Sequence, residues 1–246
     1  MSPLEKRFLP ICTLLLIGIV FLFDLQRGTQ WLLSLWIITT ALLYFVARHL
    51  QFFIEISVVK NKARRAQLFA ASTRPAEVVM LGDSITHEGL WHEYFPESSP
   101  LNRGIGGDTT RDILNRLPAV YPLQPRRLFL LIGINDLNMG REREQTLADY
   151  SKILDELRRN LPSTTVYVQS VLPVSNHWKL ARNADVLALN VQIQAQARQR
   201  DLTFIDLHPR FCDGHGELRA ELSNDGIHLG PEGYALWCEQ LRPFLP

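Results

Sequence analysis

Residues 77–86 read EVVMLGDSIT, an apolar run followed by a short polar turn that contains a serine. The run is continuous rather than alternating, which is typical of a strand buried on both faces of a parallel sheet. In such sheets the ligand binds outside the carboxyl ends of the strands. The stretch therefore predicts the first strand of an α/β domain, and it places Ser84 at the ligand-binding edge of the sheet.

The rest of the body repeats this alternation of short apolar runs and longer helical stretches. We expect further strands at residues 100–103, 127–132, 165–171 and 203–205, and helices at residues 148–160, 185–200 and 234–241. Strands that alternate with helices form a sheet with helices on both of its faces. The pattern predicts one three-layer α/β domain with a parallel sheet over residues 75–246, a normal size for a single domain.

Four short polar segments follow predicted strands or lie on a late loop. They are residues 82–86 (GDSIT), 104–108 (GIGGD), 133–136 (GIND) and 224–228 (NDGIH). Because the carboxyl ends of parallel strands meet at one edge of the sheet, we expect all four segments to line one crevice.

The side chains in these segments fit nucleophilic catalysis. A serine hydroxyl needs a base, and His228 can serve Ser84, with Asp225 fixing the imidazole tautomer. A developing oxyanion needs donors, which the N–H groups of Ser84 and Gly107 and the side-chain amide of Asn135 can supply. Each segment alone is also a common structural turn. Their order and their placement after strands favour a catalytic site.

With these residues the body resembles the SGNH or GDSL hydrolases. The likeness is carried by Gly82-Asp83-Ser84, by Gly107 and Asn135, and by Asp225 with His228. It spans residues 78–241, and residues 102–117 (NRGIGGDTTRDILNRL) are similar to the acetylhydrolase branch, typified by the platelet-activating-factor acetylhydrolase catalytic subunits. The resemblance implies a flavodoxin-like sheet, a Ser-Asp-His triad, and ester hydrolysis without a metal or another cofactor. Residues 172–178 match no particular substrate class.

We interpret the chain as a serine esterase that hydrolyses short-chain, acetyl-like esters of a lipid or a carbohydrate through an acyl-enzyme. Transfer of the acyl group to a saccharide or another alcohol would use the same residues. A non-catalytic membrane adaptor is a third interpretation, which the complete set of five site residues disfavours.

The composition points to two parts with different surroundings. The 246 residues are 46% apolar and carry a net charge of +1, which excludes a disordered chain and disfavours a nucleic-acid partner. Residues 1–71 carry a net charge of +5, whereas the remainder carries −4.

The basic front contains two runs without a charged residue, at residues 8–23 and 31–47. Their lengths of 16 and 17 residues are near the lower limit for a membrane-spanning helix. We predict a hairpin of two transmembrane helices over residues 1–47. The alternatives are a pair of buried helices in a soluble protein and, for the first run, a cleaved signal peptide.

We predict an amphipathic linker helix over residues 48–74, whose basic end rests on anionic lipid head groups. A solvated linker helix fits the same pattern equally well. Seven basic residues lie outside the two runs, against Arg27 alone between them. The positive-inside rule then places both ends of the chain, and the catalytic body, on the cytoplasmic side of the inner membrane.

One group of possible metal ligands lies outside these segments. His208, Cys212, Asp213 and His215 fall within eight residues, but the glycine-containing loop that carries them disfavours a metal site. Cys212 and Cys238 either pair in a disulfide or remain buried free thiols.

Two further groups have both a functional and a structural interpretation. The aromatic residues after the nucleophile line an acyl pocket or pack a surface helix, and two arginines meet an anionic substrate or solvent. The residues are His87, Trp91, His92 and Tyr94 in the first group, and Arg103 and Arg111 in the second.

Overall fold

The computed structural model describes residues 27–54 and 59–246, and the chain divides into two compact units, residues 1–59 and 60–246. The first predicted membrane run, residues 8–23, lies outside the described residues. The second run lies in helix α2 (Arg27–Ile54), which continues past the predicted boundary at residue 47. Within the described ranges, no helix combines the length and apolarity that crossing a bilayer requires. The predicted transmembrane hairpin therefore finds no support in this part of the chain.

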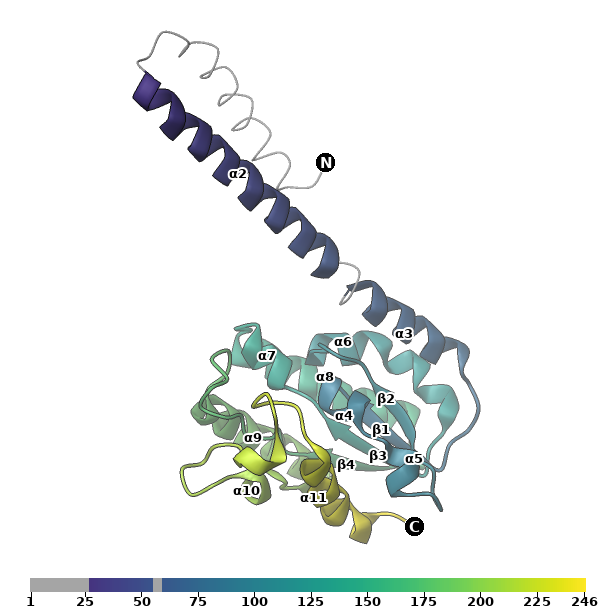
Figure 1. The fold of residues 1–246 in the computed structure, drawn as a ribbon. Helices are drawn as coiled ribbons and strands as arrows, with labels where there is room; N and C mark the ends of the chain where they lie inside the picture. The colour runs from purple at the N-terminus through teal and green to yellow at the C-terminus, as the bar shows by residue number, and fades with distance from the viewer. Residues whose placement is uncertain (1–26, 55–58) are drawn as a thin grey trace. The chain divides into compact units, whose positions relative to one another are not determined.

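The second unit is built on a sheet of five parallel strands (Figure 1). The strands are β1 (Val78–Gly82), β2 (Leu101–Gly104), β3 (Arg127–Leu131), β4 (Thr165–Gln169) and β5 (Thr203–Ile205). Their spatial order, β2-β1-β3-β4-β5, is that of flavodoxin-like sheets. The predicted parallel α/β sheet is confirmed, and each strand lies within two residues of its predicted bounds.

The register of the sheet brings three polar segments together. Gly82 pairs with Gly104 on one side and with Leu131 on the other, so β1, β2 and β3 end at the same level. All of β1 is buried, as is β3 beyond Arg127. The continuous apolar runs of these strands predict this burial, because helices cover both faces of a parallel sheet.

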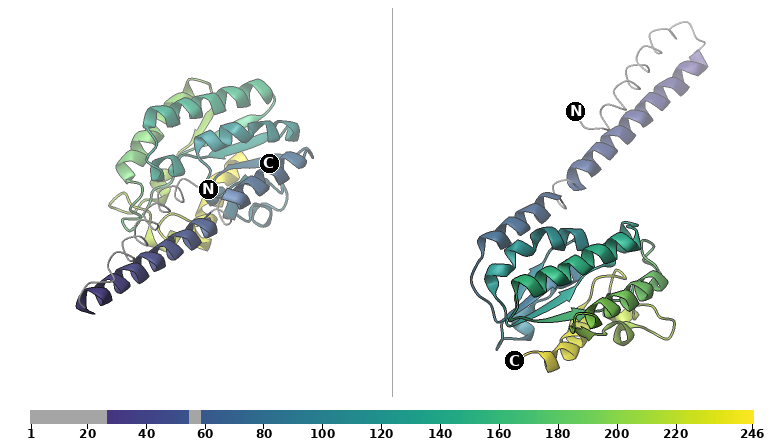
Figure 2. Two further views of the ribbon diagram at one scale, coloured as in Figure 1. Left: turned by 90° about the horizontal axis from the view of Figure 1, so that it is seen from above. Right: turned by 180° about the vertical axis from the view of Figure 1, so that it is seen from behind.

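Helices α6, α8 and α9 lie along one face of the sheet, and α4 and α11 lie on the other (Figure 2). The helices of this unit are α3 (Asn61–Ala71), α4 (Ser84–Glu88), α5 (Trp91–Tyr94), α6 (Thr110–Arg116), α7 (Ile134–Asn138), α8 (Arg143–Asn160), α9 (Asn183–Arg198), α10 (His208–Phe211) and α11 (Pro231–Leu241). The predicted helices correspond to α8, α9 and α11, of which α8 begins five residues before its predicted start.

Helix α11 holds the short helix that begins with Ser84. The Tyr234 hydroxyl donates to the carbonyl of Ile85 at 2.6 Å. Trp237 packs edge-on against Trp91 with a centroid separation of 4.8 Å. Trp91 is 1% exposed and donates through Nε1 to the Thr86 carbonyl, so it belongs to the core rather than to an acyl pocket.

Candidate active site

Ser84 is the first residue of α4 and follows β1 through a very tight turn. Asp83 caps this helix, because its Oδ1 accepts a hydrogen bond from the Ile85 N–H at 3.0 Å. A Cβ at position 82 would lie 2.2 Å from Thr86 Oγ1 and 2.4 Å from the Leu131 carbonyl oxygen. Only glycine therefore lets the chain turn here and present Ser84 at the edge of the sheet.

Three side chains from two distant segments form one hydrogen-bonded chain. Ser84 Oγ lies 3.0 Å from His228 Nε2, and His228 Nδ1 lies 2.6 Å from Asp225 Oδ2. The other carboxylate oxygen of Asp225 accepts from the backbone N–H groups of Ile227 and His228. This holds the loop in the conformation that aims the imidazole at the serine. In the tautomer protonated at Nδ1, His228 can accept the serine proton.

The carboxyl group of Asp225 stays ionised over a wide pH range. Desolvation acts to raise its pKa, but the hydrogen bonds from the His228 ring and from the Ile227 and His228 amides outweigh it. They lower the pKa of Asp225 to about 2. An ionised carboxylate beside Nδ1 stabilises the imidazolium that forms when His228 takes a proton.

Gly107 lies on the loop after β2, and Asn135 lies in the first turn of α7, which follows β3 at the same edge of the sheet. Gly107 has a φ of +75° in a turn closed by the hydrogen bond from Asp108 N to Ile105 O at 3.2 Å. A positive φ at the third residue is the feature of a type II turn, and glycine adopts it without strain. Asn135 Nδ2 donates to the Asp108 carbonyl at 2.9 Å. Among the described residues the N–H groups of Ser84 and Gly107 have no hydrogen-bond acceptor, so both remain available to an oxyanion.

Buried carboxylates hold these two segments in place. The Asp136 carboxylate, which is fully buried, accepts from Thr110 N at 2.9 Å and from Thr110 Oγ1 at 2.7 Å, and it pairs with Arg141. Asp108 accepts from Arg116 Nε at 2.6 Å, and its carboxylate is 1% exposed. Charge-assisted hydrogen bonds between buried groups are short and strong. The loop carrying Gly107 is thereby fixed to the segment carrying Asn135.

Sequence reasoning assigned no role to these supporting residues. Asp136 follows Asn135 directly and Asp108 follows Gly107, so adjacency to a predicted oxyanion donor was the available signal. Asp136 reaches Thr110 across 26 positions, a contact that adjacency alone does not reveal.

Asp83 is a buried carboxyl group beside the site. It is 0% exposed, and its Oδ2 has no hydrogen-bond partner in the described part of the chain. Desolvation raises its pKa to about 7, with the nearby Asp108 adding to the effect and the Ile85 N–H opposing it. This carboxyl group therefore titrates near neutral pH.

The loop that matches no substrate class, residues 172–178, supports the segment carrying Asp225 and His228. Ser175 N donates to the Gly226 carbonyl at 2.9 Å, and Trp178 Nε1 donates to Asn138 Oδ1 at 2.8 Å. A Cβ at position 226 would lie 2.1 Å from Ser175 Oγ, and Gly226 has a φ of +91°. Glycine is therefore required where the two loops cross.

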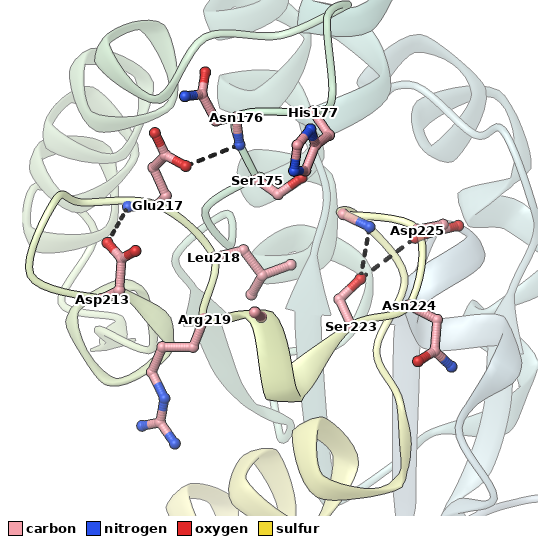
Figure 3. Close-up of a pocket in the computed structure, with 12 residues that line it drawn as sticks. Ser175, Asn176, His177, Asp213, Glu217, Leu218, Arg219, Ser223, Asn224 and Asp225 are labelled. Carbon is pink, nitrogen blue, oxygen red and sulfur yellow. Dashed lines mark hydrogen bonds between the residues drawn. The ribbon is translucent and has the colours of Figure 1, made fainter.

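A cavity of about 380 Å³ lies between this loop and residues 213–226 (Figure 3). Asp225 lines it together with Ser175 and Glu217, but neither Ser84 nor His228 does. It lies beside the acidic member of the hydrogen-bonded chain, so it is not the place where an ester would meet the serine.

The possible metal ligands do not converge. In the described ranges no three His, Cys, Asp or Glu side chains are placed to hold a metal ion. His208 Nδ1 instead lies 3.3 Å from Cys212 Sγ, and Asp213 caps its own loop by accepting from the His215 N–H. Cys212 and Cys238 are free thiols.

Of the two arginines expected at a substrate anion or in solvent, Arg103 is buried in the fold, whereas Arg111 lies at the surface with its side chain 55% exposed. Arg103 is 5% exposed and donates to Ser72 Oγ, and Arg111 donates to Asp149 Oδ2 at 3.0 Å. Of the remaining aromatic residues, Tyr94 stacks on Tyr234, His92 is exposed, and His87 is half-buried.

Comparison with known proteins gives the family. The model of the GDSL-like lipase/acylhydrolase family matches residues 80–236, and the chain belongs to this family. The platelet-activating factor acetylhydrolase IB subunit alpha1 of Pongo abelii is 30% identical over 175 residues, which cover 69% of this chain and 75% of that protein.

Two solved structures share the fold. One, from Streptococcus pneumonia and named for platelet activating factor, has a TM-score of 0.76 and 26% identity, covering 81% of this chain and 99% of its own. An acetyl xylan esterase has a TM-score of 0.61 at 19% identity, covering 69% of this chain and 99% of its own. An acetylhydrolase subunit is thus among the relatives of this enzyme, and an acetyl xylan esterase shares its fold.

Proposed function

We propose that the chain is a serine esterase that hydrolyses short-chain acyl esters, with Ser84 as nucleophile. The observation that carries this proposal is the continuous hydrogen-bonded chain from Asp225 through His228 to Ser84, at the edge where parallel sheets bind ligands. Among the described residues neither the Ser84 N–H nor the Gly107 N–H has an acceptor, which supports a site that binds a developing negative charge.

In the first half of the reaction Ser84 Oγ attacks the ester carbonyl carbon while His228 Nε2 takes the hydroxyl proton. The carbonyl oxygen becomes an oxyanion that accepts hydrogen bonds from the Ser84 and Gly107 N–H groups and from the Asn135 amide. The tetrahedral intermediate collapses to an acyl-enzyme. His228 gives its proton to the departing alcohol, while the carboxylate of Asp225 stabilises the imidazolium.

In the second half water replaces the alcohol. His228 takes a proton from the water, the hydroxide attacks the acyl-enzyme, and the same donors stabilise the second oxyanion. Collapse releases the carboxylic acid and restores the Ser84 hydroxyl. An alcohol in place of water would yield a transferred ester through the same steps, which is the acyltransferase alternative.

The relatives support a small acyl group and leave the alcohol open. The name of the acetylhydrolase relative indicates that it acts on an acetyl ester. The name of the acetyl xylan esterase indicates an acetylated polysaccharide as its substrate. We extend the acetyl preference to this chain and propose a lipid or carbohydrate ester as its substrate.

A series of p-nitrophenyl esters of increasing acyl length tests this function in the full chain. We expect the highest kcat/KM for the acetate, and we expect Ser84→Ala to abolish turnover while the thermal unfolding midpoint stays unchanged. Unaltered hydrolysis by Ser84→Ala would contradict the proposal. Adding an alcohol acceptor separates hydrolysis from transfer, because a transferase would divert acyl groups from free acid to a new ester.

We also propose that the N-terminal part anchors the enzyme to the cytoplasmic face of the membrane. Lys and Arg counts around the two apolar runs support this side. Large apolar side chains of α2 are more than half exposed, which suits contact with lipid: Leu35, Ile38, Leu42, Leu43, Phe45 and Val46. Membrane flotation of the full chain tests the anchoring, and recovery of all of it as free protein would contradict it.

The side of the membrane needs a separate test. In a background without native cysteines, Thr29→Cys places a thiol in the first turn of α2, between the two apolar runs. Labelling of intact cells by an impermeant maleimide is expected if the turn is outside. A protected thiol combined with a protease-accessible body would instead place the enzyme outside.

A further inference from the structure

Helix α3 lies outside residues 80–236, the range that the family model matches, yet it contacts the loop that carries Gly107. Lys62 Nζ donates to the Gly107 carbonyl at 3.1 Å and to Asp112 Oδ2 at 2.7 Å. The same ammonium group lies 3.1 Å from Asp108 Oδ1, and the Lys62 side chain is 24% exposed. One lysine thus contacts two residues of the loop between β2 and α6 and one residue of α6 itself.

The next two turns of α3 contact the same segment and its surroundings. Arg65 Nε donates to the Gly104 carbonyl at 2.8 Å. The Phe69 ring lies under the guanidinium groups of Arg103 and Arg116, 4.6 and 5.9 Å from its centroid. Lys62, Arg65 and Phe69 are spaced so that they share one face of the helix. The basic end of the predicted linker carries Lys60, Lys62, Arg64 and Arg65. Two of these four, Lys62 and Arg65, therefore contact the domain rather than solvent.

These contacts matter because Gly107, unlike the other proposed oxyanion donors, has no side chain through which its neighbours can hold it. A Cβ at this position would meet nothing within 4 Å, and glycine adopts many backbone conformations at little cost. The Gly107 N–H belongs to the Gly106–Gly107 peptide, and the φ and ψ of Gly107 set its direction relative to the Gly107–Asp108 peptide, whose carbonyl Lys62 binds. Asn135 holds the Asp108 carbonyl from one side, and Lys62 holds the Gly107 carbonyl from the other.

We propose that Lys62 is a positioning residue for the oxyanion hole, and that α3 is part of the catalytic unit rather than a passive tether. The inference rests on the proposed esterase function. Lys62 does not touch substrate. It acts by holding the Gly107–Asp108 peptide, which restricts the φ and ψ of Gly107 and so keeps the N–H of the preceding peptide, that of Gly107, directed at the oxyanion.

Full-chain variants test this role. Lys62→Met removes the ammonium group but keeps an unbranched side chain, Lys62→Arg restores a cationic donor, and Arg64→Met removes an exposed charge from the same helix as the matched control. We expect Lys62→Met to lower kcat about 10- to 100-fold with KM nearly unchanged, because small displacements of catalytic groups cost rate rather than binding. Lys62→Arg should recover most of the rate, and Arg64→Met should match the wild type.

Two measurements do not depend on the natural substrate. The rate at which a fluorophosphonate labels Ser84 should fall in Lys62→Met, since the phosphonyl oxygen needs the same donors. Hydrogen–deuterium exchange of the peptide covering residues 104–109 should become faster than in Arg64→Met. Unchanged exchange would overturn the proposal, and so would faster exchange with wild-type kcat and labelling.

The same data separate this inference from the proposed function. A wild-type chain that neither reacts with fluorophosphonate at Ser84 nor hydrolyses esters would contradict the esterase function and, with it, a catalytic role for Lys62. An active wild type whose Lys62→Met variant is equally active would contradict the positioning role alone.

Discussion

Asp225 and His228 reach Ser84 from an exposed loop, whereas Gly107 and Asn135 lie on segments held by buried ion pairs. The side chains of Asp225 and His228 are 49% and 32% exposed, whereas Asp136 and Asp108, which support the other half, are 0% and 1% exposed. Asp225 and His228 form the proton-transfer half of the site, which can adjust and exchange protons with solvent. Gly107 and Asn135, with their buried supports, form the oxyanion half. The oxyanion half is fixed before substrate arrives, which is the arrangement that lowers a barrier by electrostatic preorganisation.

The largest effect on kcat should come from a substitution in the exposed half, which contains Asp225 and His228. Asp225→Asn keeps the shape of the side chain but removes the charge that stabilises the imidazolium and selects its tautomer. We expect kcat to fall about 10²–10⁴-fold, the usual contribution of general acid–base catalysis. Steady-state kinetics with p-nitrophenyl acetate measures it. A loss below threefold would show that the hydrogen bond between His228 and Asp225 is not needed for proton transfer.

Loss of a donor from the oxyanion half should lower kcat and leave substrate binding unchanged. Asn135→Ala removes a donor that matters mainly in the transition state, so we expect kcat to fall about 10²–10³-fold with little change in KM. The same assay separates the two constants. A change confined to KM would make Asn135 a substrate-binding residue and would withdraw it from the oxyanion hole.

Removing the buried Asp136 carboxylate, which supports the oxyanion half, should lower the free energy of unfolding. Asp136→Asn leaves Arg141 without one carboxylate partner, and we expect a loss of about 3 kcal/mol in the free energy of unfolding. The control Asp185→Asn breaks the exposed pair with Arg182 and should change stability by less than about 1 kcal/mol. Urea unfolding measures both variants. Equal losses would contradict the contrast between buried and exposed pairs.

The smallest effect is a pH dependence of stability at Asp83. Its pKa is raised to about 7 in the folded chain, against about 4 for an unfolded aspartate, so the folded state binds more protons between these values. Its contribution to stability is therefore present below about pH 4 and is lost as the pH rises through 7. Asp83→Asn does not titrate.

We therefore expect the unfolding midpoint of Asp83→Asn, relative to the wild type, to rise between pH 4 and pH 8. Differential scanning fluorimetry across this range measures the difference. A difference that stays constant with pH would show that the Asp83 carboxyl group is not desolvated as the structure indicates.

The strands could be predicted because their apolar runs are continuous and end in glycine or polar residues. The end of β4 was overestimated by two residues, since the amide of Val171 bonds to the Asn190 side chain instead of extending the strand. The four polar segments were recognisable because each follows a strand or carries an Asp-x-x-His spacing. Their convergence follows from parallel topology.

The parts that sequence reasoning missed depend on partners far apart in the chain. Asp136 meets Thr110 across 26 positions, and Lys62 meets Gly107 across 45. No local pattern distinguishes these charged residues from solvated ones. Arg103 illustrates the point, because a solvent position was expected and the side chain is 5% exposed.

The covalent state of Ser84 tests the central claim most directly. Treating the full chain with a fluorophosphonate and mapping its peptides by mass spectrometry locates the reactive nucleophile. The account predicts one adduct on Ser84, absent from Ser84→Ala and strongly slowed in His228→Ala. An adduct on another residue, or undiminished labelling of Ser84→Ala, would contradict it.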